Sequence, residues 1–302
     1  MRVGFVVYGS LNQTSGGFRY DRKLVEYLRK KGDTVEVISL PWRDDWRNVI
    51  AGVSPRLRRT LDKPFDVLIQ DELCYPTLWR LNRRLTRPGA TVALVHHFNS
   101  VNRRGRLGWL RWWLERQYLE SVDGWVATSD FTRQRARTVA AAPAESVVAP
   151  PAGRRSGRPV TEKQVRTRAA DRPLRILYLG NVIERKGLCT LLSALDGLST
   201  ESSKPTDSSG WQLTVVGSTE PEPAYAAQTR RRVAELDLSE HVDFVGEVSD
   251  DEVIAQLEAS HVLCVPSRYE GFGMVYLEAM EYGVVPIATT KGGANEVSVR
   301  AR

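Results

Sequence analysis

Short apolar runs alternate along most of the chain with longer stretches of helix-like periodicity. Runs of roughly four to eight apolar residues bounded by glycine, proline or polar residues predict buried strands, and the stretches between them predict covering helices. In the first half the expected strands are Val3 to Tyr8, Val35 to Leu40, Val67 to Gln70, Thr91 to Val95, Gly124 to Thr128 and Val147 to Ala149. Such alternation is typical of a parallel sheet covered by helices on both faces.

The alternation resumes after a proline-rich interruption. Between Ala140 and Pro173 five prolines break any long helix, which predicts an interdomain linker. Beyond it we expect Arg175 to Leu179, a helix from Gly187 to Leu198, Gln212 to Val216, a helix within 224 to 238, Val242 to Val245, a helix from Asp250 to Ser260, and Val262 to Val265. The sequence predicts two α/β domains, residues 1–150 and 174–302, joined by a linker at 151–173. The Ser-rich stretch from Glu201 to Gly210 is expected to be a mobile loop.

Composition places the chain among ordinary globular proteins. Its 302 residues are 42% apolar and 26% charged, which is enough for two cores. No apolar run approaches the roughly 20 residues of a membrane span, and the first strand starts at once after Met1 without a signal-peptide pattern. The three cysteines are far apart, so they suggest neither a disulfide framework nor a zinc site. We therefore expect a cytoplasmic protein with reduced thiols.

The chain carries a formal net charge of +7, mostly through an excess of arginine. Nucleic acid, an anionic membrane surface and polyanionic substrates are the three partners that could account for this charge. Because the sequence contains no nucleic-acid-binding motif and its basic residues are spread over many helices, we expect no nucleic acid and favour a membrane surface.

The segment after the run Val262 to Val265 combines glycines and glutamates at a strand end. Glu270 lies in the Glu-Gly-Phe-Gly turn, and Glu278 lies in the helix that follows and stops near Gly283. The first amides of a helix attract phosphate oxygens, and Gly271 and Gly273 let the backbone approach a ligand closely. Two carboxylates at this spacing could accept hydrogen bonds from two hydroxyl groups of one nucleotide sugar. The alternative is that both glutamates are solvated surface residues.

This segment, EGFGMVYLEAMEYGVVPIAT, resembles the Glu-x7-Glu signature of the retaining family 4 glycosyltransferases. The resemblance implies an α/β protein of the GT-B fold, in which two doubly wound, Rossmann-like domains face each other across a cleft. It also implies that Glu270 faces the donor sugar and Glu278 the ribose, with Gly271, Phe272 and Gly273 in the donor-binding turn.

A glycine-rich loop follows the first expected strand. Gly16 and Gly17 open the next helix, which makes them candidates for an anion-binding cradle. The loop matches neither the dinucleotide fingerprint G-x-G-x-x-G nor the P-loop pattern, and a plain tight turn is the alternative. The resemblance implies that this loop faces the diphosphate and the acceptor.

Two histidines follow the strand Thr91 to Val95, at the edge where open α/β sheets bind ligands. At least one of them is expected to be a structural imidazole. The resemblance implies that a histidine here faces the donor sugar, and the ungapped comparison favours His96 over His97.

Arg185 and Lys186 precede the helix from Gly187, where the helix dipole favours acidic residues instead. Two adjacent cations there require a compensating anion, which a diphosphate would supply. A solvated basic turn is the alternative. Arg185 and Lys186 match the phosphate-binding pair of the family, although Asn181 stands where many members have a further arginine.

Residues 103 to 122 predict an amphipathic helix with two apolar faces. Leu110, Trp113 and Leu114 lie on the face that we expect in the core, while the other stripe holds Trp109, Trp112 and Arg116. Together with the preceding basic residues Arg103, Arg104 and Arg106, this second stripe has the composition of a helix resting on anionic lipid. Packing of these tryptophans against the domain's own loops is the alternative.

The resemblance ends with the chain at Arg302, whereas relatives continue for a further strand and several helices. We therefore expect the second domain to be incomplete, with apolar sheet surface exposed at its edge.

From these features we predict a retaining, metal-independent glycosyltransferase of polysaccharide biosynthesis. It would move a hexosyl group from a nucleotide-diphosphate sugar to a hydroxyl of a glycan or lipid-linked saccharide. No cofactor is expected, and no metal, because no Asp-x-Asp motif stands at a strand end. The protein would lie in the cytoplasm and bind peripherally to the inner membrane face. A non-hydrolysing sugar-nucleotide epimerase and a catalytically dead sugar-nucleotide-binding remnant are the alternatives.

Overall fold

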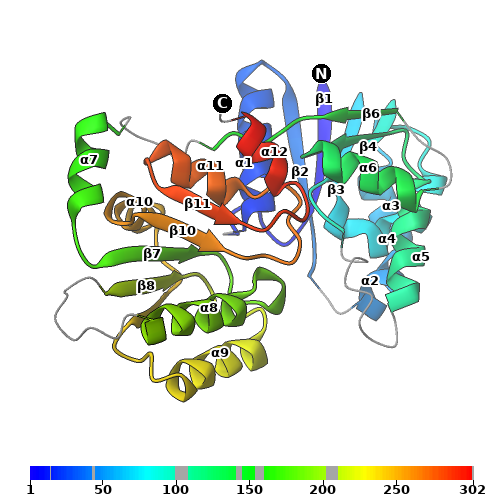
Figure 1. Cartoon of the computed structure of the whole chain (residues 1–302). Helices are drawn as coiled ribbons and strands as arrows, with labels where there is room; N and C mark the ends of the chain where they lie inside the picture. Colours follow the sequence, from blue (N-terminus) through cyan, green and yellow to red (C-terminus); the bar gives the residue numbers. More distant parts are fainter. Residues whose placement is uncertain are drawn as a thin grey trace. The chain divides into compact units, whose positions relative to one another are not determined.

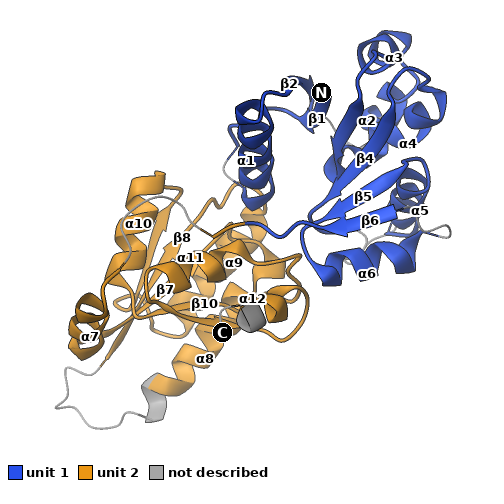
Figure 2. Cartoon of the chain, turned by 90° about the horizontal axis from the view of Figure 1, so that it is seen from above, with its two compact units in different colours: residues 1–151 blue, residues 152–302 orange. Residues whose placement is uncertain are grey.

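The chain divides into two compact units, residues 1–151 and 152–302 (Figure 2). The structure is a computed structural model, and it describes residues 1–13, 15–42, 45–98, 108–140, 145–153, 160–201 and 210–300. Each unit contains one parallel sheet with helices packed against it, so the predicted α/β fold class is confirmed.

The first unit is built on a six-stranded parallel sheet in the order β2-β1-β3-β4-β5-β6 (Figure 1). Its strands are β1 (Arg2–Tyr8), β2 (Thr34–Leu40), β3 (Val67–Asp71), β4 (Ala90–Val95), β5 (Gly124–Ala127) and β6 (Glu145–Val148). Its helices are α1 (Gly16–Lys30), α2 (Asp45–Ala51), α3 (Pro55–Leu61), α4 (Tyr75–Leu81), α5 (Gly108–Leu119) and α6 (Asp130–Val139), with short 3-10 turns η1 (Glu72–Cys74) and η2 (Asn82–Arg84).

Both faces of this sheet are covered, as the continuous apolar strands predict. Along β1, Phe5 and Val7 pack with Phe18 of α1 on one face. Val6 and Tyr8 point to the other face, in the core that α3 to α6 cover. Alternate residues of one strand therefore fill two different cores, which explains why nearly every position of β1 is apolar.

The second unit has a five-stranded parallel sheet in the order β11-β10-β7-β8-β9. Its strands are β7 (Leu174–Leu179), β8 (Trp211–Val216), β9 (Val242–Gly246), β10 (Val262–Val265) and β11 (Val285–Ala288). Its helices are α7 (Glu162–Ala170), α8 (Leu188–Glu201), α9 (Pro223–Glu235), α10 (Asp250–Ala259), α11 (Met274–Glu281) and α12 (Ala294–Arg300), with a 3-10 turn η4 (Glu184–Lys186).

Helix α7 lies within the range that the prolines predicted to be a linker. Its residue Arg168 is 8% exposed and donates hydrogen bonds to four carbonyl groups at the ends of α10 and α11. The two shortest run from Nη2 to Gly283 O at 2.7 Å and to Tyr282 O at 2.8 Å. The predicted linker is therefore corrected: much of it is a folded part of the second unit. The sequence did not reveal this because the partners of Arg168 lie about 90 to 115 residues further along the chain.

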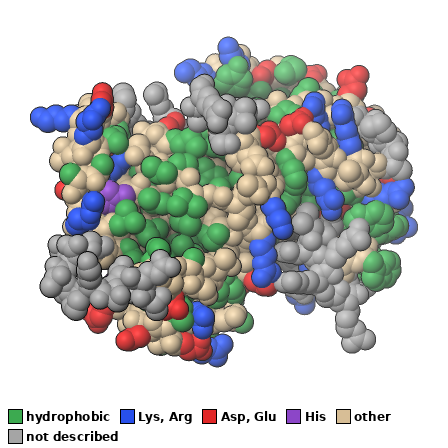
Figure 3. Space-filling model, in the orientation of Figure 1, with side chains coloured by type: hydrophobic (Ala, Val, Ile, Leu, Met, Phe, Trp, Pro, Cys, Tyr) green, Lys and Arg blue, Asp and Glu red, His purple; other side chains and the backbone are tan. Residues whose placement is uncertain are grey.

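Strand β11 forms one edge of the second sheet. This strand was not predicted from the sequence. It contains Pro286, and proline, which cannot donate to a central ladder, is tolerated in an edge strand. Val285 and Ile287 of this edge strand are 61% and 51% exposed. Figure 3 shows hydrophobic side chains gathered over this part of the second unit.

Helix α5 differs in detail from the predicted lipid-facing helix. Trp109 is 68% exposed, but Trp112 packs partly against the core and against the Arg116 guanidinium, 5.8 Å from its ring centroid. Trp113, which was assigned to the core face, is 38% exposed and meets the ring of Trp79 edge-on. The exposed tryptophans are thus one helical turn apart at 109 and 113.

The expected basic residues Arg103, Arg104 and Arg106, and most of the Ser-rich stretch after Glu201, lie outside the described residues. Within the described part of the chain, no helix is long and apolar enough to cross a membrane.

Candidate functional site

Each sheet reverses its strand order at one point, and the candidate residues gather there. In the second unit the chain runs outward from β7 toward β8 and β9 on one side, and toward β10 and β11 on the other. The connections that leave neighbouring β7 and β10 therefore diverge, which makes the carboxyl ends of these two strands the topological switch point of the sheet. Arg185 and Lys186 follow β7, and Glu270 follows β10.

A buried ion-pair cluster fills this switch point in the second unit. The Lys186 ammonium lies 2.7 Å from Oε1 of Glu270, and Nη1 of Arg185 lies 3.4 Å from Oε2. The hydroxyl group of Ser267 donates to Oε1 at 2.7 Å. Glu270 is 7% exposed, so the predicted alternative of a solvated loop residue is wrong. The anion that Arg185 and Lys186 require is, in this structure, the carboxylate of Glu270.

The two cations decide the charge of Glu270. Burial would raise the pKa of this carboxyl group, but Lys186 and Arg185 outweigh burial and lower the pKa to about 2. Glu270 is therefore ionised at any physiological pH. It accepts hydrogen bonds and does not donate them.

Gly293, in the loop after β11, and Gly273, at the start of α11, shape the backbone around Glu270. The amide of Gly293 donates to the carbonyl oxygen of Glu270 at 2.8 Å. A Cβ atom at Gly293 would lie 2.0 Å from the carbonyl oxygen of Gly271, so the loop can approach only without a side chain. Gly273 caps α11 with a φ of 88°, a conformation that favours glycine.

Two further predicted donor-binding residues, Glu278 and Phe272, lie in or next to this turn. Glu278 lies in α11 and is 2% exposed, which also contradicts a solvated surface position. Phe272 is 5% exposed and belongs to the hydrophobic core, so its ring contributes packing.

The first unit also reverses its strand order, between β1 and β3. The chain leaves β1 toward α1, which begins at Gly16, and leaves β3 through Asp71 and Glu72. Beside β3, the end of β4 leads into His96. Here too, side chains from separate connections meet at the carboxyl edge of the sheet.

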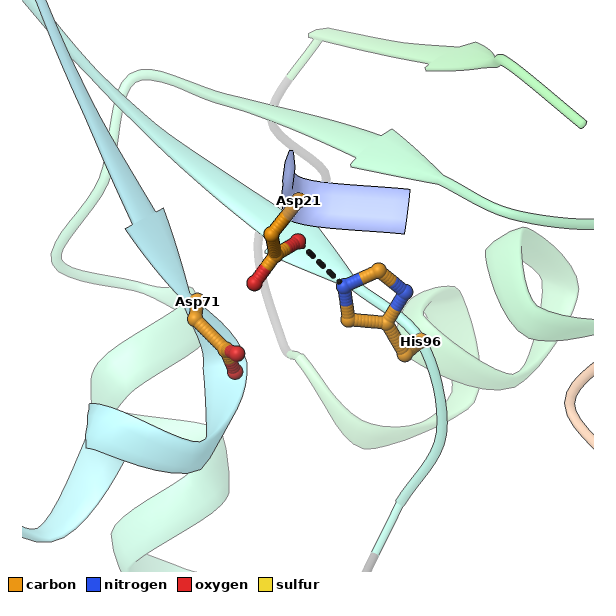
Figure 4. Close-up of side chains that lie close together, drawn as sticks. All are labelled: Asp21, Asp71 and His96. Atoms are coloured by element: carbon orange, nitrogen blue, oxygen red, sulfur yellow. Dashed lines mark hydrogen bonds and ion pairs between the residues drawn. The ribbon is translucent and has the colours of Figure 1, made fainter. Parts of the chain in front are cut away.

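His96 contacts two acidic residues from these connections, of which Figure 4 shows Asp21. Its Nε2 atom lies 2.9 Å from Oδ1 of Asp21 on α1, and its backbone amide donates to Oε2 of Glu72 at 2.9 Å. Asp21 is fully buried, and the His96 side chain is 11% exposed. The His97 ring lies 3.3 Å from Oε1 of Glu72 and is 33% exposed. A carboxylate therefore contacts each of the two predicted histidines, and the side chain of His96 is the more buried of the two.

These neighbours set the charge of each group in the first unit. Burial would lower the pKa of His96, but the charges of Asp21 and Glu72 raise it to about 10. Burial, together with Glu72 and Asp21, raises the pKa of Asp71 well above its usual range. Burial would raise the pKa of Glu72, but His96 and His97 bring it below its ordinary value. At neutral pH the cluster therefore contains an imidazolium beside an ionised Glu72, and Asp71 keeps its proton to a higher pH than an ordinary aspartate does.

The predicted glycine pair lies at the start of α1. Gly17 packs against the His96 ring, since a Cβ atom at Gly17 would come within 3.4 Å of Cδ2. Gly16 is exposed, and the side chain of Ser15 caps the helix by accepting from the amide of Phe18. The pair thus lies beside the predicted histidine.

Sequence reasoning missed Asp21, Asp71, Glu72 and Ser267. The Asp71-Glu72 pair could have been noticed, because two acidic residues directly after a buried strand fall at the ligand-binding edge of the sheet. Asp21 carried no such signal. A single aspartate in a predicted helix is normally a surface residue, and only the position of α1 relative to β4 makes it a partner of His96.

Two family models match consecutive parts of the chain. Residues 12–153 match the glycosyl transferase 4-like domain, and residues 160–301 match the glycosyl transferases group 1. Among curated proteins, the chain is 29% identical over 218 residues to the MMP alpha-(1->4)-mannosyltransferase of Mycolicibacterium hassiacum. This match covers 68% of the chain and 49% of the relative, so the chain spans about half the length of that relative.

Solved structures share the fold. Sucrose-phosphate synthase from Thermosynechococcus elongatus superposes with a TM-score of 0.76 at 22% identity, covering 97% of this chain and 82% of that one. Anabaena HepE in complex with UDP-glucose gives a TM-score of 0.67 at 16% identity, covering 98% and 82%. The two family models together account for nearly all of the chain, and its two parallel-sheet units match glycosyltransferase structures. The chain therefore belongs to the family 4 glycosyltransferases of the GT-B fold.

Proposed function

We propose that the chain is a retaining glycosyltransferase that moves a hexosyl group from a nucleotide-diphosphate sugar to an acceptor hydroxyl of a glycan or lipid-linked saccharide. The observation that carries the proposal is the buried cluster of Lys186, Arg185 and Glu270 at the switch point of the second unit. Family membership supports the reaction class, and the UDP-glucose bound to the structurally similar HepE supports a nucleotide sugar as donor.

The two cations are suited to a diphosphate leaving group. Negative charge grows on the diphosphate as its bond to the sugar breaks, and cations already held in place stabilise that charge without reorganisation. Arg185 can bind phosphate oxygens bidentately, and Lys186 can follow them as a mobile point charge. Both cations contact Glu270, but one carboxylate offsets only one of the two positive charges, so positive charge is left for the diphosphate. This account assigns charge neutralisation to the protein and requires no metal ion.

The two glutamates are suited to sugar hydroxyl groups. Glu270 is ionised and held within a few ångströms of both cations, so a ligand whose diphosphate contacts Lys186 would place its sugar hydroxyls near this carboxylate. Glu278 follows about one turn into α11. We assign Glu270 to the donor sugar and Glu278 to the ribose, as the resemblance implies. Retention of configuration, through a front-face reaction, belongs to the same proposal.

We further propose that α5 rests on an anionic membrane surface. Trp109 and Trp113 are exposed on successive turns of this helix, and the chain carries a net charge of +7. Exposed tryptophans near cations are typical of helices at a lipid interface. A lipid-linked acceptor would be presented at that surface.

Thermal unfolding with a panel of nucleotide sugars tests the donor assignment. A ligand that binds the folded state raises its stability by mass action, by roughly 2.7 kcal/mol at 100 times the Kd. Lys186→Ala should abolish both this stabilisation and transfer, and should remain folded because Arg185 and Ser267 still contact Glu270. Arg166→Ala is the matched control, since Arg166 is a strongly exposed cation of α7.

Turnover then separates the possible reactions. Transfer to an acceptor, with the anomeric configuration of the product determined by NMR, should show retention. Conversion of the donor without any acceptor would instead indicate an epimerase. If no nucleotide sugar stabilises the wild-type chain, or if Lys186→Ala turns over at the wild-type rate, the proposed function is wrong.

A further inference from the structure

His96 lies within a buried acidic cluster whose members come from separate elements of the first unit. Asp21 comes from α1, Asp71 from the end of β3, and Glu72 from η1. The three carboxyl groups are 0%, 1% and 6% exposed. Charged groups at this depth are costly unless they are paired. The arrangement therefore demands positive charge or protons within the cluster.

The imidazole of His96 supplies that positive charge. The ring of His96 forms a hydrogen bond with Asp21 through Nε2, and the backbone amide of His96 donates a hydrogen bond to Glu72. These two contacts fix the ring and the backbone at the end of β4. Tyr20 of α1 packs edge-on against the ring at a centroid distance of 5.3 Å; burial raises its pKa to about 12, so it stays neutral.

The carboxyl group of Asp71 lies beside this pair. Oδ2 of Asp21 is buried and has no hydrogen-bond partner among the described residues, and the side chains of Asp21, Asp71 and His96 approach within 4.8 Å of one another. Burial and the neighbouring carboxyl groups Glu72 and Asp21 raise the pKa of Asp71 well above its usual range. Asp21 is the carboxyl group that contacts the His96 ring, through the 2.9 Å hydrogen bond between Oδ1 and Nε2.

The second ring nitrogen of His96 points away from Asp21, as Figure 4 shows. With Nε2 occupied by Asp21, only Nδ1 can serve a ligand. An imidazolium carries a proton on both nitrogens, so Nδ1 becomes a charged hydrogen-bond donor and cannot act as a base.

We propose that Asp21 is a positioning residue that fixes the His96 ring and holds it as an imidazolium, so that Nδ1–H donates a charged hydrogen bond to a sugar or phosphate oxygen of the substrate. The part played by the substrate rests on the proposed function. The charge and the orientation of His96 do not, and they can be measured without turnover.

A divalent cation held by Asp21, Asp71 and His96 is the competing arrangement. The 2.9 Å separation between Nε2 and Oδ1 places a proton between these atoms as a hydrogen bond, and a ring nitrogen that carries a proton cannot ligate a metal ion. The test therefore includes Mn²⁺ and Zn²⁺ as separate probes.

NMR of the imidazole nitrogens in the full chain tests the charge state. The chain has four histidines, and His96→Gln identifies the signals of His96 by their loss. In the wild-type chain both ring nitrogens should remain protonated from pH 6 to above pH 9. In Asp21→Asn the His96 signals should titrate at a clearly lower pH, because the nearest anion is gone. A wild-type His96 that titrates near pH 6.5 would overturn the proposal.

The pH profile of transfer separates positioning from a merely structural role. Asp21→Asn should lose at least tenfold in kcat/KM at pH 8, and should regain activity as the pH falls and the ring becomes protonated. Asp21→Glu, which keeps the charge, should restore part of the activity at pH 8. An equal loss at every pH, or no rescue by glutamate, would contradict the proposal.

The metal probes complete the test. If Mn²⁺ or Zn²⁺ raises the melting temperature of the wild-type chain, and Asp21→Asn removes that rise, the cluster binds a metal ion and the proposal is wrong. If the chain turns over no nucleotide sugar, the proposed function fails, while the NMR titration still decides the role of Asp21.

Discussion

Replacing Glu270 by glutamine should destabilise the second unit in a way that depends on pH. The change keeps the size of the side chain and removes its charge, while Lys186 and Arg185 stay in place. A buried ion pair that loses one partner leaves the other charge uncompensated. We therefore expect Glu270→Gln to fold with lower stability at neutral pH.

The magnitude follows from the pKa of Glu270. A shift from its ordinary value of 4.5 to about 2 corresponds to about 3 kcal/mol, since each pKa unit is worth about 1.4 kcal/mol. Because the folded-state pKa is depressed, this stabilisation is fully present above about pH 5 and is lost as the pH falls toward 2. By pH 3 the contribution of Glu270 to the free energy of unfolding should be smaller by about 2 kcal/mol. The difference in the free energy of unfolding between the wild-type chain and Glu270→Gln should therefore become about 2 kcal/mol smaller between pH 6 and pH 3.

Urea unfolding followed by ¹⁹F NMR of 5-fluorotryptophan can isolate the second unit. Seven of the eight tryptophans lie in the first unit, and Trp211 lies in the second, where it is 7% exposed. Its resonance reports unfolding of the unit that contains Glu270, and Trp211→Phe assigns it.

Glu162→Gln is the matched control, because the ion pair of Glu162 with Arg166 is more than three-quarters exposed on both sides. Exposed pairs contribute roughly 0–1 kcal/mol, so this change should have little effect. A Glu270→Gln variant whose deficit is the same at pH 3 and pH 6, or no larger than that of the control, would refute the electrostatic account.

Three further outcomes are expected. Arg168→Met should lower the free energy of unfolding of the second unit by roughly 3 kcal/mol or more, because several carbonyl groups at the ends of α10 and α11 lose a charged donor. Urea unfolding followed through the Trp211 resonance measures this loss, and an unchanged urea midpoint would contradict it. Transfer should survive EDTA, because Arg185 and Lys186 are proposed to neutralise the diphosphate; activity that EDTA removes and Mn²⁺ restores would count against that role. The chain should sediment with anionic vesicles and be released by salt, and a Trp109→Ser, Trp113→Ser double variant should bind less; equal binding to neutral vesicles would favour packing without lipid.

Much of the local structure could be predicted from periodicity alone. The apolar runs located ten of the eleven strands to within one or two residues, because a strand buried on both faces is apolar at nearly every position. The exception, β11, contains Pro286 and lies at an edge, where burial is weaker and the pattern is broken. Helix α7 was missed because the prolines around it were taken as the sign of a linker, whereas its buried Arg168 depends on carbonyl groups far along the chain.

The candidate site likewise combines residues that the sequence identifies with contacts that only the tertiary structure decides. Motif spacing was enough to select Glu270, Glu278, Arg185 and Lys186, since a strand end, a glycine turn and a helix start are all local features. The order of strands in each sheet is not local. Only the tertiary structure placed β10 beside β7, which brings Glu270 to Lys186, and the end of β4 beside the start of α1, which brings His96 to Asp21. Contacts of this kind decide burial and charge, because a carboxylate that is solvated in an isolated segment becomes a buried partner only when another segment of the chain covers it.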